Sequence, residues 1–175
     1  MGFLLLVATA ACAWSQDLTG PKGPSVSILP TPVTSVTAGA PGKVSLHFRV
    51  VRGFHINSNT PRSEFLIPTV LKLDAPTDIV VGKITYPTGQ DMSFPFAPDE
   101  KLSVFSGDFT VGVVVRPLAH VIPQKYVFRG RLKYQACDNA ACYPPKQLPV
   151  QFEIKVAKAP PKRVANPAQS PHAHR

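Results

Sequence analysis

Two cysteines in the last third of the chain are the residues best suited to chemistry. Cys137 and Cys142 enclose four residues and are followed directly by Tyr143-Pro144-Pro145. A thiol pair at this spacing can form one disulfide, which acts either as a structural staple or as a couple that exchanges with other thiols. The chain-entropy model gives so small a loop only about 2 kcal/mol of stabilisation, so the pair is poorly placed as a staple. Position alone leaves both interpretations open.

The charges around the two cysteines bear on their reactivity. Thiolates are favoured by a helix N-terminus or by nearby positive charge. This pair has Asp138 beside it, with Lys133 and Lys146 as partial compensation. It therefore suits a relay that receives and hands on reductant better than a strong oxidant. Two thiols are too few for a structural zinc site, and we predict neither a metal site nor a cofactor. Three histidines are separated from the cysteines in the sequence: His47, His55 and His120.

Short apolar runs between turn residues must position this pair. Residues 43–50 alternate between polar and apolar side chains, which is the pattern of a half-buried strand with His47 facing outward. Similar runs separated by turn residues recur along the chain, and their spacing predicts an all-β sandwich or barrel of seven or eight strands. The other runs are 24–29, 66–73, 79–86, 109–115, 126–136 and 148–156.

The last two runs are expected to pair as a hairpin with the cysteines at its mouth. Directly opposed residues in such a pair have Cα atoms about 4.5–5.5 Å apart, a distance that a disulfide can bridge. Cys137 continues the outward-facing set Arg131, Lys133 and Gln135. We therefore expect Cys137 to be accessible to another protein.

The first 16 residues are predicted to be a signal peptide. An apolar run over residues 3–13 is too short to cross a bilayer and precedes a small-residue cleavage site at Ala13-Trp14-Ser15. Thr9-Ala10-Ala11-Cys12 is a loose version of a lipoprotein box, so a lipid anchor at Cys12 is the alternative to ordinary secretion. In both cases the protein is expected to be periplasmic or secreted, where disulfides persist.

The rest of the chain divides into one domain, residues 17–156, and a basic, proline-rich tail, residues 157–175, that we expect to be disordered. The tail contributes four of the positive charges behind the net charge of +9 and contains no acid. A nucleic-acid partner is not expected, because no basic face with interleaved aromatic residues is evident.

The cysteine segment resembles a known family. Leu132-Lys133-Tyr134-Gln135-Ala136-Cys137, followed by Cys142-Tyr143-Pro144-Pro145, resembles the cysteine hairpin of the N-terminal periplasmic domain of the DsbD thiol:disulfide interchange protein. Residues 53–61, together with Ile67-Pro68-Thr69, are similar to another stretch of that family. The resemblance covers roughly residues 25–156.

The resemblance implies an immunoglobulin-like β-sandwich and a relay function. Cys137 and Cys142 would form the redox couple of a thiol:disulfide oxidoreductase subunit of the protein-disulfide reductase type, without a cofactor. The couple would take electrons from a thioredoxin-like or membrane donor and pass them to oxidised periplasmic proteins. The chain ends after its tail, so we expect a stand-alone version whose donor is another polypeptide. Its spacing is one residue shorter than in the best-known members.

Several aromatic residues have two interpretations. Phe94 and Phe96 would form the cap that shields the disulfide in this family, or they are ordinary core or rim aromatics. Tyr134 and Tyr143 shape the pocket around the cysteines, or they only pack the hairpin. His55 is expected to be a surface or hydrogen-bonded residue, with tuning of the site as the alternative. The alternative function is a non-enzymatic, immunoglobulin-like binding module with a passive disulfide.

Overall fold

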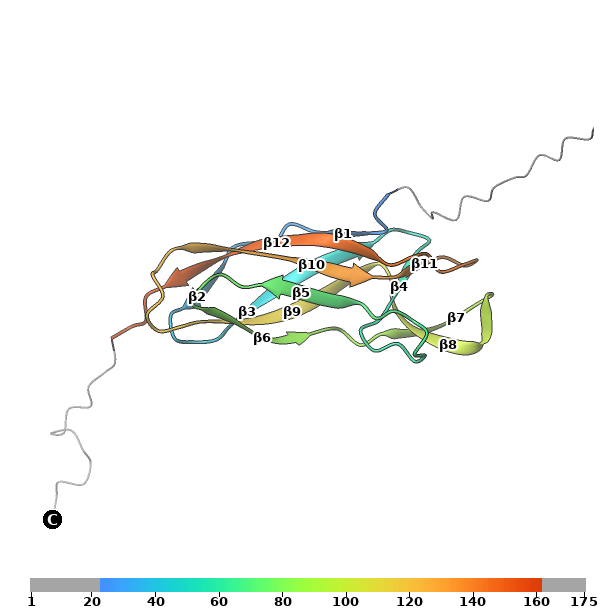
Figure 1. The fold of residues 1–175 in the computed structure, drawn as a ribbon, viewed down its shortest axis with the longest axis horizontal. Helices are drawn as coiled ribbons and strands as arrows, with labels where there is room; N and C mark the ends of the chain where they lie inside the picture. The colour runs from blue at the N-terminus through green and yellow to red at the C-terminus, as the bar shows by residue number, and fades with distance from the viewer. Residues whose placement is uncertain (1–22, 162–175) are drawn as a thin grey trace, which may run out of the picture.

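The computed structural model describes residues 23–161, which form β-strands and connecting loops (Figure 1). The predicted signal peptide, Cys12 and residues 162–175 of the predicted tail lie outside the described residues. Within this range, no helix long and apolar enough to cross a membrane is present.

Two four-stranded sheets pack against each other to form an immunoglobulin-like β-sandwich, as predicted. The first contains, in order, β1 (Val26–Ile28), β3 (Gly42–Val50), β9 (Asp108–Pro117) and β6 (Ile79–Thr85). The second contains β2 (Thr34–Thr37), β12 (Lys146–Ala157), β10 (Lys125–Tyr134) and β5 (Val70–Asp74). Neighbouring strands are antiparallel apart from β12 and β2, which run parallel.

Alternating apolar side chains from both sheets fill the core between them. Leu46 and Phe48 of β3 are fully buried, whereas His47 between them is exposed, as the alternation predicts. Phe128 of β10 stacks on Phe152 of β12 with ring centroids 4.8 Å apart. Burying each large apolar side chain contributes about 1.5–3 kcal/mol, so this core supplies the main stabilisation of the domain.

A third sheet lies at one end of the sandwich, on the right in Figure 1. Its order is β11 (Ala136–Cys137), β4 (His55–Asn57), β8 (Ala97–Phe105) and β7 (Gln90–Phe94), all antiparallel. Strand β11 follows β10 after a single residue, Gln135, so the chain passes directly from the second sheet into the third. This sheet carries the cysteine hairpin.

The structure contains twelve strands among the described residues, more than the seven or eight predicted. Strands β2, β4 and β11 have only four, three and two residues, too few for an alternating pattern to be recognised. Strand β7 and the first half of β8 are mostly exposed on both faces, so they have no apolar alternation at all. The third sheet was therefore not predicted from the sequence, whereas the long strands of the sandwich were.

Candidate functional site

Cys137 and Cys142 are joined by a disulfide with an S–S distance of 2.03 Å. The Asp138 amide donates to the Ala141 carbonyl, and the Tyr143 amide donates to the Ala136 carbonyl. The cysteines lie between these two hydrogen bonds as a non-hydrogen-bonded antiparallel pair. Cα atoms approach closest in such pairs, and here they are 4.0 Å apart, somewhat closer than expected. The hairpin geometry thus brings the two sulfurs into bonding distance.

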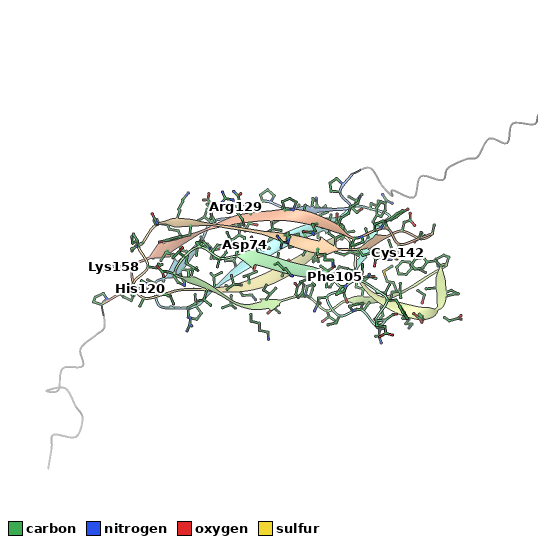
Figure 2. The ribbon with its side chains drawn as sticks, viewed as in Figure 1. Asp74, Phe105, His120, Arg129, Cys142 and Lys158 are labelled. Atoms are coloured by element: carbon green, nitrogen blue, oxygen red, sulfur yellow. A yellow bond between two sulfur atoms is a disulfide. The ribbon has the colours of Figure 1, made fainter. Side chains whose placement is uncertain are left out.

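Cys137 is fully buried, so the prediction that it faces outward is wrong. The outward set of β10 ends because the chain changes sheets at Gln135, and the alternation does not continue into β11. Cys142, on the return segment, is only partly buried. The disulfide therefore joins one fully buried cysteine to one that is partly exposed. Figure 2 shows Cys142 close to one end of the molecule, with His120 and Lys158 at the opposite end.

His55 lies next to the disulfide. It pairs with Cys137 across strands β4 and β11, and Cys137 pairs in turn with Cys142. Directly opposed residues share a face of the sheet, so the three side chains form a row across it. His55 is only 3% exposed, and the expected surface position is wrong. Burial lowers the pKa of His55 to about 4, although the charge of Asp138 acts in the opposite direction.

Two phenylalanines extend the row of side chains. Phe94 stacks on His55 with ring centroids 3.8 Å apart, and Phe96 stacks on Phe94 at 5.5 Å. Phe94 is buried in a small cluster with Leu102 and Val104, and Phe96 packs against that cluster. The structure thus brings both predicted cap residues to the cysteine end of the molecule, where they reach the disulfide through His55.

The turn between the cysteines is organised by Asp138. Its carboxylate accepts hydrogen bonds from the backbone amides of Ala140 and Ala141, at 2.8 and 2.9 Å, and from the hydroxyl of Tyr143. These bonds, the one from Tyr143 foremost, hold the pKa of Asp138 below its usual value. The same contact raises the pKa of Tyr143. Asp138 is therefore a fixed negative charge beside the sulfurs, which disfavours a thiolate there.

The two tyrosines that flank the cysteines lie in different surroundings. Tyr134 is 1% exposed and belongs to the main core, and it is hydrogen-bonded to the backbone near Ser25 and Val26. Tyr143 is partly exposed and packs against Phe54, with ring centroids 6.2 Å apart. Of the two, Tyr143 is in direct contact with the cysteine turn.

Sequence reasoning missed a buried polar network beneath the site. The Asn57 side-chain amide donates to the Ile67 carbonyl at 3.1 Å and to Oε1 of Gln135 at 3.0 Å. Gln135 Oε1 also accepts from the Ile67 amide, and the Thr69 hydroxyl donates to the Asn57 carbonyl. Residues 53–61 and 67–69, which resemble one family segment, meet here. The network anchors β4 and therefore the position of His55.

Comparisons with known proteins identify a family and several similar structures. The sequence profile of the family described as thiol:disulfide interchange protein DsbD, N-terminal, matches residues 26–154. The chain is similar to the reduced DsbD N-terminal domain of Neisseria meningitidis, with 23% identity, a TM-score of 0.41 and coverage of 67% of this chain and 80% of that one. It is also similar to AggA, the major fimbrial subunit of Escherichia coli, with 14% identity, a TM-score of 0.41 and coverage of 75% and 94%. No curated protein matches the sequence.

Proposed function

The chain belongs to the family of DsbD N-terminal domains, and on this premise we propose that it relays reducing equivalents by thiol–disulfide exchange through Cys137 and Cys142. Family membership and the disulfide together fit a thiol–disulfide exchange module. We further propose that the protein is a protein-disulfide reductase subunit without a cofactor. A thioredoxin-like donor would reduce it, and oxidised periplasmic or secreted proteins would oxidise it.

The asymmetric burial of the two cysteines is the observation that carries this proposal. Cys142 is partly exposed, whereas Cys137 is fully buried. A thiolate of the donor attacks Cys142 Sγ, the S–S bond breaks, and its electron pair passes to Cys137 Sγ, which then takes up a proton. The second thiol of the donor attacks the mixed disulfide and releases the reduced protein. Two electrons and two protons have moved, and the donor dithiol has become a disulfide.

In the reverse half of the relay, Cys142 is the attacking residue. Its thiolate attacks the disulfide of an acceptor protein and forms a mixed disulfide, which Cys137 then resolves. This division of roles follows from access, because a buried thiol cannot meet an external disulfide but can reach its neighbour.

The aromatic residues support selectivity in this scheme. Phe94 and Phe96 would cap the enclosed side of the couple, so that small thiols and unrelated proteins exchange slowly. Tyr143 would shape the accessible side through its contact with Asp138. Tyr134 would act only indirectly, by fixing the end of β10 in the core.

Trapping a mixed disulfide tests the proposal. Cys137→Ser leaves Cys142 free to attack but removes the resolving thiol, so it should accumulate a covalent complex with an oxidised thioredoxin-like protein. Cys142→Ser is the matched control and should trap little. The reduction potential of the wild-type couple should lie above about −300 mV, the upper limit typical of structural disulfides. A lower potential together with no trapping by either variant would indicate a binding module with a passive disulfide.

A further inference from the structure

One polar atom in the row of side chains beside the disulfide has no partner. His55 Nε2 is buried, and no described residue forms a hydrogen bond with it. Buried polar atoms in folded proteins are nearly always paired, so this exception requires a physical explanation. The nitrogen belongs to the residue that directly opposes Cys137 in the sheet.

The surroundings of the ring leave few candidates for a partner. One face of His55 is covered by Phe94 at 3.8 Å, and Phe96 lies parallel to it at 6.4 Å. Neither phenylalanine can form a conventional hydrogen bond. The residue directly opposite His55 in the sheet is Cys137, whose sulfur is committed to the disulfide in this structure. A disulfide sulfur has no hydrogen to donate, whereas a thiol is a donor.

We propose that His55 Nε2 accepts a hydrogen bond from the Cys137 thiol once the disulfide is reduced, so that His55 favours the reduced form of the couple. This inference rests on the proposed function and adds a positioning residue to it. The ring nitrogen is unpaired when the S–S bond is closed and paired when it is open. Reduction by a protein dithiol supplies the two electrons and two protons, and one of these protons is the one shared between Cys137 Sγ and Nε2.

The state of the imidazole is consistent with this role. Burial keeps the ring neutral at physiological pH, because its pKa is about 4. A neutral ring with its proton on Nδ1 presents Nε2 as an acceptor. The neutral ring can therefore accept a hydrogen bond from the neutral Cys137 thiol. Neither group has to carry a charge in this apolar environment.

Replacing His55 by phenylalanine tests the proposal, because an aromatic ring is kept for the stack on Phe94 and the ring nitrogens are removed. We expect the equilibrium constant for reduction of His55→Phe by glutathione to fall about tenfold, the size typical for losing the partner of a buried polar group. This corresponds to a reduction potential about 30 mV more negative. His120→Phe is the matched control, since His120 is exposed and lies at the opposite end of the molecule (Figure 2). A change of less than twofold in His55→Phe would overturn the inference.

A measurement on the wild-type protein covers the case in which His55→Phe does not fold. The ¹⁵N shift of His55 Nε2 should move in the direction of a hydrogen-bonded acceptor when the disulfide is reduced, while His47 and His120 stay unchanged. An Nε2 shift that is the same in both redox states would overturn the inference. Neither negative result contradicts the proposed function, which fails only if the Cys137–Cys142 couple does not exchange with the thiols or disulfides of other proteins. Trapping by Cys137→Ser reports on that separately.

Discussion

The rings of His55 and Phe94 are stacked with their centroids 3.8 Å apart and their planes inclined by 14°. These residues are on β4 and β7, and β8 lies between those strands in the third sheet. The Phe94 side chain must therefore lie over the face of the sheet to reach His55. Cys137 shares that face, because it directly opposes His55. The stack thus links Phe94, one of the two predicted cap residues, through His55 to the buried cysteine of the disulfide.

Removing the Phe94 ring should expose this side of the couple. Phe94→Ala is expected to accelerate reduction of the disulfide by dithiothreitol and to lower the free energy of unfolding by up to about 3–5 kcal/mol, the range for deleting a buried phenylalanine. The rate of reduction, followed by the loss of the S–S bond, measures the first effect, and urea unfolding measures the second.

Phe65→Ala is the matched control for Phe94→Ala. Phe65 is 86% exposed, so its deletion should change neither the rate nor the stability appreciably. Equal rates of reduction in Phe94→Ala and the wild-type protein would show that Phe94 is a core aromatic and not a cap.

Asp138 should make the stability of the cysteine turn depend on pH. Its pKa in the folded protein is lowered, chiefly by the hydrogen bond from Tyr143. The stabilisation by its charge is therefore complete above the unfolded-state pKa of about 3.9 and is lost as the pH falls through the lower, folded-state value. Asp138→Asn should be less stable than the wild-type protein at pH 7, and the difference in melting temperature should shrink as the pH falls through the folded-state pKa of Asp138.

The same substitution should also affect sulfur reactivity. Removing a negative charge beside the couple favours the thiolate, so the pKa of the accessible Cys142 thiol should fall in reduced Asp138→Asn. The rate of alkylation as a function of pH measures this pKa. A thiol pKa equal to or above that of the wild-type protein would contradict the role assigned to the carboxylate.

How much the sequence predicts depends on the length of each element. Strands such as β3 and β12 contain enough alternating residues to identify both the strand and its buried face. The buried position of Cys137 was not predictable in this way. It depends on the chain changing sheets at Gln135, and the alternation of polar and apolar residues gives no sign of that change. His55 was misjudged for a related reason, since a three-residue strand provides no pattern from which to infer burial. Only the resemblance of residues 53–61 to a family segment marked this region.

Asn57 is expected to be essential for stability. Its side chain is fully buried and links β4 to Gln135 and to the Ile67 carbonyl. Asn57→Ala removes the side-chain donor from the Ile67 carbonyl and leaves Gln135 Oε1 with only its bond from the Ile67 amide, which costs about 1–3 kcal/mol. Asn139→Ala, in the exposed turn between the cysteines, should change the free energy of unfolding by less than about 0.5 kcal/mol. Comparable losses in the two variants, measured by urea unfolding, would exclude a structural role for the Asn57 network.

The fold should survive opening of the disulfide, as a relay requires. The bond closes a loop with a sequence separation of only five, so its removal should cost about 2 kcal/mol. Cys137 is also absent from the main core cluster, which is built from the strands of the sandwich and their neighbours. The double substitution Cys137→Ala and Cys142→Ala should therefore give a folded protein with a moderately lower melting temperature. The reduced wild-type protein should show a similar decrease and recover fully on reoxidation. Global unfolding on reduction, seen as loss of the near-ultraviolet circular dichroism signal, would mean that the disulfide holds the domain together and cannot be opened in each catalytic cycle.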